Sequence, residues 1–152
     1  MSQRLNYRTV SPKGLEAMAG LESYVRNSGL EKSLLELVKT RASQINGCAY
    51  CLDMHTRDAR AGGESEQRLY TLSAWRETSF FTARERAALA WAEAVTRIAE
   101  RPIEDALYES ARQQFGEKEL VDLTLAVIAI NGWNRLAISF RKVPGTYQPA
   151  HH

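Results

Sequence analysis

The chain has 152 residues, of which 44% are hydrophobic and 25% charged, a composition typical of a globular domain that buries its own core without disulfides or metals. Twenty basic residues against 18 acidic ones leave a formal charge of +2, and the basic residues are scattered among the acids rather than gathered in a stripe. A nucleic-acid partner is therefore not expected.

The first half of the chain has helical rather than alternating periodicity. Ser11 followed by Pro12 is typical of a helix start, and this helix is expected to end near residues 27–29. A second helix is predicted from about residue 31 to 45, because its apolar residues recur at helical spacing. That apolar stripe consists of Leu34, Leu35, Val38, Ala42 and Ile45.

Further helices are predicted through the middle of the chain. One begins near Gly47 or Cys48 and ends at the paired glycines 62–63, and a shorter one covers about residues 66–76. The stretch Thr82 to Glu85 is a capping box that opens a helix running toward Pro102. A sixth segment, residues 103–115, is stopped by glycine at position 116.

The last strong segment, residues 117–140, contains the apolar run LTLAVIAI, which residue type alone also allows as a buried strand. Its length favours a helix buried on most sides. No repeat, low-complexity tract or linker interrupts residues 1–152, so a single domain is expected. The predicted fold class is all-α, a compact bundle of about six to seven helices around one central helix, with a neighbouring subunit as a further cover.

The protein is expected to be cytoplasmic and not bound to a membrane. The N-terminus has no apolar stretch that resembles a signal peptide, and the apolar run at residues 123–130 is too short to span a bilayer. Because cytoplasmic thiols are kept reduced, a CxxC pair there is more often catalytic or metal-binding than structural.

Cys48, Cys51 and His55 form the most informative pattern, within the stretch NGCAYCLDMHTRDARAGG. On a helix they lie within about 60° of one another, and Cα atoms three residues apart are about 5 Å apart, a separation that a disulfide can bridge. The helix N-terminus would favour a thiolate at Cys48, whereas only Cys51 lies within about one turn of the His55 base. The sequence does not decide which effect is larger.

Two other interpretations of these residues remain open. A zinc site built from Cys48, Cys51 and His55 lacks a fourth ligand, because there is no second CxxC and the remaining histidines, 151 and 152, are at the chain end. The cysteines could also be plain packing residues beside a solvated histidine.

The stretch LLELVKTRASQINGCAYCLDMHTRDAR resembles the active-site segment of the alkylhydroperoxidase D-like members of the carboxymuconolactone decarboxylase-like superfamily. The family pattern is a glutamate, eleven residues, CxxC, three residues and a histidine. It selects Glu36, Cys48, Cys51 and His55, and the strong match covers about residues 31–62. Residues 120–140 are similar to the family's second core helix, so most of the chain is compatible with its all-helical fold.

The resemblance implies a thiol-dependent peroxidase that acts on organic hydroperoxides. Cys51 would attack the peroxide and become a sulfenic acid, and Cys48 would condense with it to a disulfide. Glu36 and His55 would form a proton relay, in agreement with the distance argument for Cys51. An external dithiol, such as a lipoylated or thioredoxin-like protein, would reduce the disulfide, by attack at Cys48 as the more exposed sulfur.

Three features fit the family pattern less directly. Tyr50 occupies the position of a histidine in the full motif, which puts the length of the relay and the catalytic rate in question. Periodicity alone assigns Glu36 to a solvated face, so its role requires that another helix or subunit cover that face. Asn131, Asn134 and Arg135 are polar groups in an apolar helix, and they would either orient the relay or contact a subunit, or else mark an exposed helix end.

The family also implies a homo-oligomer, for which a hexamer built as a trimer of dimers is expected. No metal, flavin or nucleotide cofactor is expected, because the sequence has no GxGxxG, no P-loop and no closed ligand set. One alternative function is a thiol–disulfide oxidoreductase or redox sensor with little peroxidase activity. A second is a decarboxylase of the carboxymuconolactone type, which has no need of the two cysteines.

Overall fold

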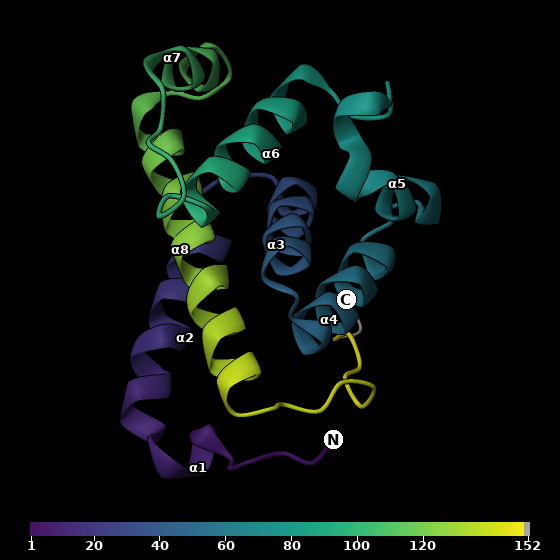
Figure 1. Cartoon of the computed structure of the whole chain (residues 1–152), viewed down its shortest axis with the longest axis vertical. Helices are drawn as coiled ribbons and strands as arrows, with labels where there is room; N and C mark the ends of the chain where they lie inside the picture. Colours follow the sequence, from purple (N-terminus) through teal and green to yellow (C-terminus); the bar gives the residue numbers. More distant parts are fainter. Residues whose placement is uncertain (151–152) are drawn as a thin grey trace.

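The computed structural model of the chain describes residues 1–150, and His151 and His152 lie outside the described residues. Within that range the protein is all-α and has no strand, as predicted (Figure 1). Its elements are α1 (Tyr7–Val10), α2 (Pro12–Arg26), α3 (Lys32–Asn46), α4 (Ala49–Ala61), α5 (Glu66–Thr71), a 3₁₀ helix (Leu72–Glu77), α6 (Ala83–Thr96), α7 (Asp105–Gln114) and α8 (Glu117–Ser139).

All seven predicted helices are present, with two differences from the sequence prediction. The helix predicted over 66–76 divides into α5 and the 3₁₀ helix, with Ala74 in a non-helical conformation. The short α1 was not predicted, because four residues are too few to show a period. It is held by its cap, since the Asn6 side chain accepts the Arg8 N–H at 3.1 Å, and by burial of Tyr7.

Helix α8 is the central helix of the bundle. It packs against α2, α3 and α6, and the run that residue type left ambiguous is helical throughout (Figure 1). By length and composition α8 would pass for a membrane span, yet Leu123, Ala126, Val127 and Ile130 on it are completely buried in this chain. It therefore has the packing of a core helix, and its apolar surface is used to hold the other helices in place.

The connection from α3 to α4 sets up the functional region. Gly47 ends α3 in the left-handed conformation, with φ of 70°, which glycine adopts without a side-chain clash. The Cys48 N–H then donates to the Ser43 carbonyl at 3.0 Å, and Cys48 is the N-cap of α4. Because only two residues separate the helices, α3 and α4 pack along one another and face each other across their polar sides.

The two terminal segments of the chain lie against this helix pair from outside. The Arg4 N–H donates to the Phe140 carbonyl at 3.0 Å, and the Tyr7 and Phe140 rings are 5.9 Å apart, so the N-terminal segment is attached to the end of α8. After α8 the chain crosses to α4, where the Gly145 N–H donates to Asp53 at 2.9 Å (Figure 1). Segments far apart in the sequence thus meet beside α4.

Candidate active site

Cys48 and Cys51 are both free thiols at the N-terminal end of α4. Their Sγ atoms are 2.6 Å apart, and Cys48 Sγ also accepts the backbone N–H of Cys51 at 3.4 Å. A disulfide between them therefore needs no movement of the helix. Both residues are only 1% exposed, so the expectation that Cys48 is the more exposed sulfur is wrong.

The two thiols ionise as a pair that shares one proton. Hydrogen bonding from the Cys51 thiol lowers the pKa of Cys48 to about 7, and it outweighs the opposing effect of burial. The same hydrogen bond, together with burial and the neighbouring charge, raises the pKa of Cys51 far above its ordinary value. At neutral pH the negative charge is therefore favoured on Cys48, the position that the helix N-terminus also favours.

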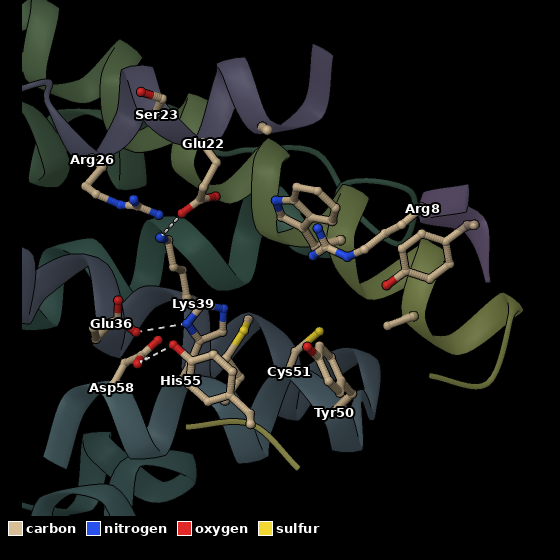
Figure 2. Close-up of a pocket in the computed structure, with 16 residues that line it drawn as sticks. Arg8, Glu22, Ser23, Arg26, Glu36, Lys39, Tyr50, Cys51, His55 and Asp58 are labelled. Atoms are coloured by element: carbon tan, nitrogen blue, oxygen red, sulfur yellow. Dashed lines mark hydrogen bonds and ion pairs between the residues drawn. The ribbon is translucent and has the colours of Figure 1, made fainter. Parts of the chain in front are cut away.

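Glu36 of α3 and His55 of α4 form a pair, with 2.9 Å between His55 Nδ1 and Glu36 Oε2 (Figure 2). His55 is buried, whereas Glu36 keeps part of its surface open. Within residues 1–150 His55 makes no hydrogen bond to Cys51, although both line the same cavity. The proximity that helical spacing gives Cys51 and His55 is therefore not a direct hydrogen bond, and the two side chains face the cavity that they share.

The polar face of α3 that carries Glu36 is covered, as its role requires. Lys39, Thr40 and Ser43 on that face are 4%, 1% and 0% exposed. Each neighbouring element supplies a partner: α2 provides Glu22 for Lys39, and α4 provides His55 for Glu36. Solvation of this face, which periodicity alone favoured, is therefore wrong, and helices of the same chain suffice to cover it.

Asp58 and Tyr147 extend this group and were not found from the sequence. The Tyr147 hydroxyl donates to Asp58 at 2.7 Å, and ligand-type atoms of Glu36, His55 and Asp58 lie within 4.8 Å of one another. Burial raises the pKa of Asp58, and the charge of Glu36 adds to this effect. Asp58 could have been noticed three residues after His55, on the same face of a helix, whereas nothing in the sequence marks Tyr147.

The structure gathers a different set of metal-type donors from the one considered for zinc. In the part of the chain that the structure describes, the close set is Glu36, His55 and Asp58, and the cysteines do not belong to it. These donors already bond one another or Tyr147, so hydrogen bonds within the protein account for their arrangement.

Cys51 and the Glu36–His55 pair open on one cavity of about 330 Å³ (Figure 2). Its walls come from α1, α2, α3, α4, α8 and the C-terminal segment, and its aromatic members are Tyr7, Tyr50, Trp133 and Tyr147. Cys48 instead borders a second hollow of about 400 Å³, between the start of α4 and residues 137–144. Tyr50 and Ala137 line both spaces.

Four aromatic residues from the middle of the chain do not contribute to this cavity. Trp75, Phe81 and Trp91 are buried in the core, and none of them lines the cavity beside Cys51, nor does the exposed Phe80. Their position agrees with the general preference of such residues for the core. The aromatic walls of the cavity come from α1, α4, α8 and the C-terminal segment.

The polar residues of α8 form a bridge behind the cysteines. Asn134 is completely buried, donates to Ser43 at 3.0 Å and accepts from Asn46 at 2.9 Å. Asn131 also accepts from Asn46, and Arg135 donates to Asn131, both at 2.9 Å. Asn134 hydrogen bonding also lowers the pKa of both cysteines. These residues thus fix the end of α3 from which Cys48 follows, and an exposed helix end is the wrong description of Asn134.

Comparisons with known proteins agree with the motif. The chain is 45% identical to the uncharacterized protein YdfG of Bacillus subtilis, over 91% of this chain and 95% of that one. It is 35% identical to the alkyl hydroperoxide reductase AhpD of Bradyrhizobium diazoefficiens, but only over 43% of this chain and 32% of the relative. A crystal structure from Agrobacterium tumefaciens, of a protein of unknown function proposed as an antioxidant defence protein AhpD, has a TM-score of 0.92 and 45% identity, over 96% of this chain and 100% of that one.

The family profile described as "Carboxymuconolactone decarboxylase family" matches residues 12–94, a range that contains Glu36, both cysteines and His55. With its alkylhydroperoxidase D-like relatives and its matching all-helical fold, the chain belongs to the carboxymuconolactone decarboxylase family.

Proposed function

We propose that this protein is a thiol-dependent peroxidase that reduces organic hydroperoxides, and secondarily hydrogen peroxide, through a Cys48–Cys51 disulfide cycle. The observation that carries the proposal is that a buried dithiol and a Glu36–His55 pair open on one cavity. Neither group needs such a neighbour for packing alone, whereas cleavage of an O–O bond needs both a thiolate and a proton donor.

The first step is attack of the Cys51 thiolate on the terminal oxygen of the hydroperoxide. The Cys51 proton moves to Cys48 across the 2.6 Å contact, which places the negative charge on the sulfur that faces the cavity. A sulfur–oxygen bond forms, the O–O bond breaks, and the alkoxide leaves with the electron pair. The relay of His55 and Glu36 supplies the proton that turns the alkoxide into an alcohol.

The second step removes the sulfenic acid on Cys51. The Cys48 thiol condenses with it, a disulfide forms, and the hydroxyl leaves as water. An external dithiol then reduces the disulfide by exchange and is itself oxidised. The hollow beside Cys48 supports entry of this reductant, a lipoylated or thioredoxin-like protein, at Cys48.

The proposal includes a cytoplasmic homo-oligomer, a trimer of dimers. Exposed apolar residues on α8, Val121 at 59% and Ile128 at 50%, support a subunit contact there. Size-exclusion chromatography with light scattering is expected to give six chains per particle, and a stable monomer would contradict this part of the proposal.

Intact-mass spectrometry tests the activity directly. Reduced protein treated with one equivalent of cumene hydroperoxide is expected to lose two hydrogens rapidly, and the Cys48→Ser variant is expected to hold one added oxygen on Cys51. An unchanged mass after one equivalent would overturn the peroxidase proposal. An untreated sample carried through the same quench is the control for oxidation by air.

A second function, thiol–disulfide exchange with little peroxidase activity, is favoured by one observation. The pKa of Cys48 near 7 is close to the optimum for an attacking thiol at neutral pH. The His55→Ala variant separates the two functions, because peroxide turnover depends on the relay whereas disulfide exchange does not. Equal loss of both activities, or of neither, would favour exchange as the main role.

A further inference from the structure

Every carboxylate on the cavity wall has a hydrogen-bond or ion-pair partner, whereas two of the cationic side chains there have none in the described part of the chain. Each carboxylate has a partner within the protein: the pairs are Glu22 with Lys39, Glu36 with His55, and Asp58 with Tyr147. Arg8 and Arg26 also line the cavity, and neither guanidinium makes a hydrogen bond or ion pair within residues 1–150. The cavity therefore presents two guanidinium groups whose hydrogen-bonding capacity no protein group among the described residues uses.

Arg8 is held over the part of the cavity where the chemistry would occur. Tyr7 beside it is buried, and the attachment of residue 4 to the end of α8 fixes the segment that carries it. Figure 2 shows the Arg8 side chain reaching over the cavity on the side of Cys51 and Tyr50, while Arg26 lies on the other side, near Glu22 and Lys39. The Arg8 Cζ atom is 5.9 Å from the centre of the Trp133 ring, so an apolar wall accompanies the charge.

We propose that Arg8 binds a carboxylate on the substrate, so that the preferred substrate is a compact organic hydroperoxide that bears a carboxylate. This inference rests on the proposed peroxidase function and names its substrate class. A guanidinium matches a carboxylate with two parallel hydrogen bonds, and its planar face remains free to lie against Trp133.

The size and lining of the cavity agree with such a substrate. About 330 Å³ is at the small end of ligand pockets, which suits a single-ring or short-chain acid rather than a long lipid. Met54, Trp133 and Tyr7 provide an apolar stretch between the charged groups. A neutral alkyl hydroperoxide would occupy the same stretch but would leave Arg8 without a partner.

The kinetic experiment compares 4-carboxycumene hydroperoxide with its methyl ester, which differs only in the charged group. Wild-type kcat/KM is expected to be about tenfold or more higher for the acid. Arg8→Gln is expected to remove this preference, mainly by raising KM for the acid, and to leave the ester nearly unchanged. Arg26→Gln removes one equal charge from the same cavity and is expected to keep the preference.

Binding of the corresponding alcohols separates failure of this inference from failure of the peroxidase proposal. The two alcohols carry no O–O bond, and their binding to the reduced protein can be measured by calorimetry. Tighter binding of the acid alcohol that Arg8→Gln abolishes would support the carboxylate site, even if neither hydroperoxide is turned over. Equal affinity for acid and ester, or an effect of Arg26→Gln as large as that of Arg8→Gln, would overturn it.

Discussion

The cavity has two kinds of wall. On one side, the α3–α4 pair contributes Cys51, Glu36 and His55, which lie within twenty residues of one another and are mostly buried. On the other side, the N-terminal and C-terminal segments contribute Arg8 and Tyr147, which reach α4 from opposite ends of the chain. The helix pair carries the reactive groups in local spacing, whereas the terminal segments close the space around them. The reactivity is therefore expected to tolerate changes in the terminal segments much better than changes in the helix pair.

The largest expected effect lies in the helix pair. Glu36→Gln removes the carboxylate that pairs with His55, and the second-order rate of reaction with hydroperoxide is expected to fall about a hundredfold or more. Glu16→Gln, on the exposed side of α2, is the matched control and is expected to leave the rate unchanged. Stopped-flow measurement of the intrinsic fluorescence change on oxidation provides the rate. A fall smaller than threefold would exclude Glu36 from the relay.

The bridge behind the helix pair is expected to matter for stability. Asn134→Ala removes the buried partner of Ser43 and one of the two acceptors of Asn46, which should lower the free energy of unfolding by about 2 kcal/mol. Urea titration followed by circular dichroism measures the change. Asn27→Ala, at an exposed helix end, is the control and should cost less than about 0.5 kcal/mol. Similar losses in the two variants would contradict the role of the bridge.

The ionisation of the cysteine pair gives a pH dependence with a defined sign. The pKa of Cys48 is about 7 in the folded protein and 9.0 without the fold, so between these pH values the unfolded chain binds more protons. The free energy of unfolding of the reduced protein should therefore rise with pH from 7 to 9, and the gain should be lost as pH falls through 7. Thiolate absorbance at 240 nm should show a midpoint near pH 7. In Cys48→Ser, both the rise of the free energy of unfolding with pH and the absorbance midpoint near pH 7 should be lost. If either persists, it belongs to another titrating group.

The smallest expected effect lies in the C-terminal segment. Tyr147→Phe removes the hydroxyl that lowers the pKa of Asp58, so the pKa of Asp58 should rise further and stability should fall by about 1 kcal/mol. The peroxide rate should stay within about threefold of wild type, because only a single hydrogen bond to a neighbour of the relay is lost. Tyr70→Phe, on an exposed hydroxyl, is the control. A rate loss as large as that of Glu36→Gln would contradict the expectation that the terminal segments matter less for reactivity than the α3–α4 pair.

The helices and the cysteine geometry could be predicted because their signals are local. The Thr82 capping box, Pro12 and Gly47 mark helix ends through backbone chemistry that depends on a few neighbours. Cys48, Cys51 and His55 share a face because helical spacing alone puts them there. The roles assigned to these residues and to Glu36 stay predictions until the variants are measured.

The environment of Glu36 and the cavity walls from the chain ends could not be predicted, because they depend on packing between segments that are distant in the sequence. The face of α3 that carries Glu36 has the pattern of a solvated face, because polar residues usually face water. In the structure its polar side chains pair instead with side chains of α2 and α4. The same pattern of residues would suit either environment, so periodicity could not decide. Arg8 and Tyr147 reach the cavity through tertiary contacts of the chain ends, for which single-chain periodicity has no signal.

The separation of the two sulfurs between different hollows has a consequence for steady-state kinetics. Cys51 borders the cavity with the relay and Cys48 borders the hollow at residues 137–144, with Tyr50 as a shared wall. The alcohol product and the reductant therefore do not compete for one volume, and a ternary complex is sterically open. Because O–O cleavage is irreversible and the reductant acts only on the disulfide, double-reciprocal plots at several reductant concentrations should be parallel. The alcohol product should then fail to compete with the reductant, whereas a shared entrance would make the alcohol a competitive inhibitor toward it.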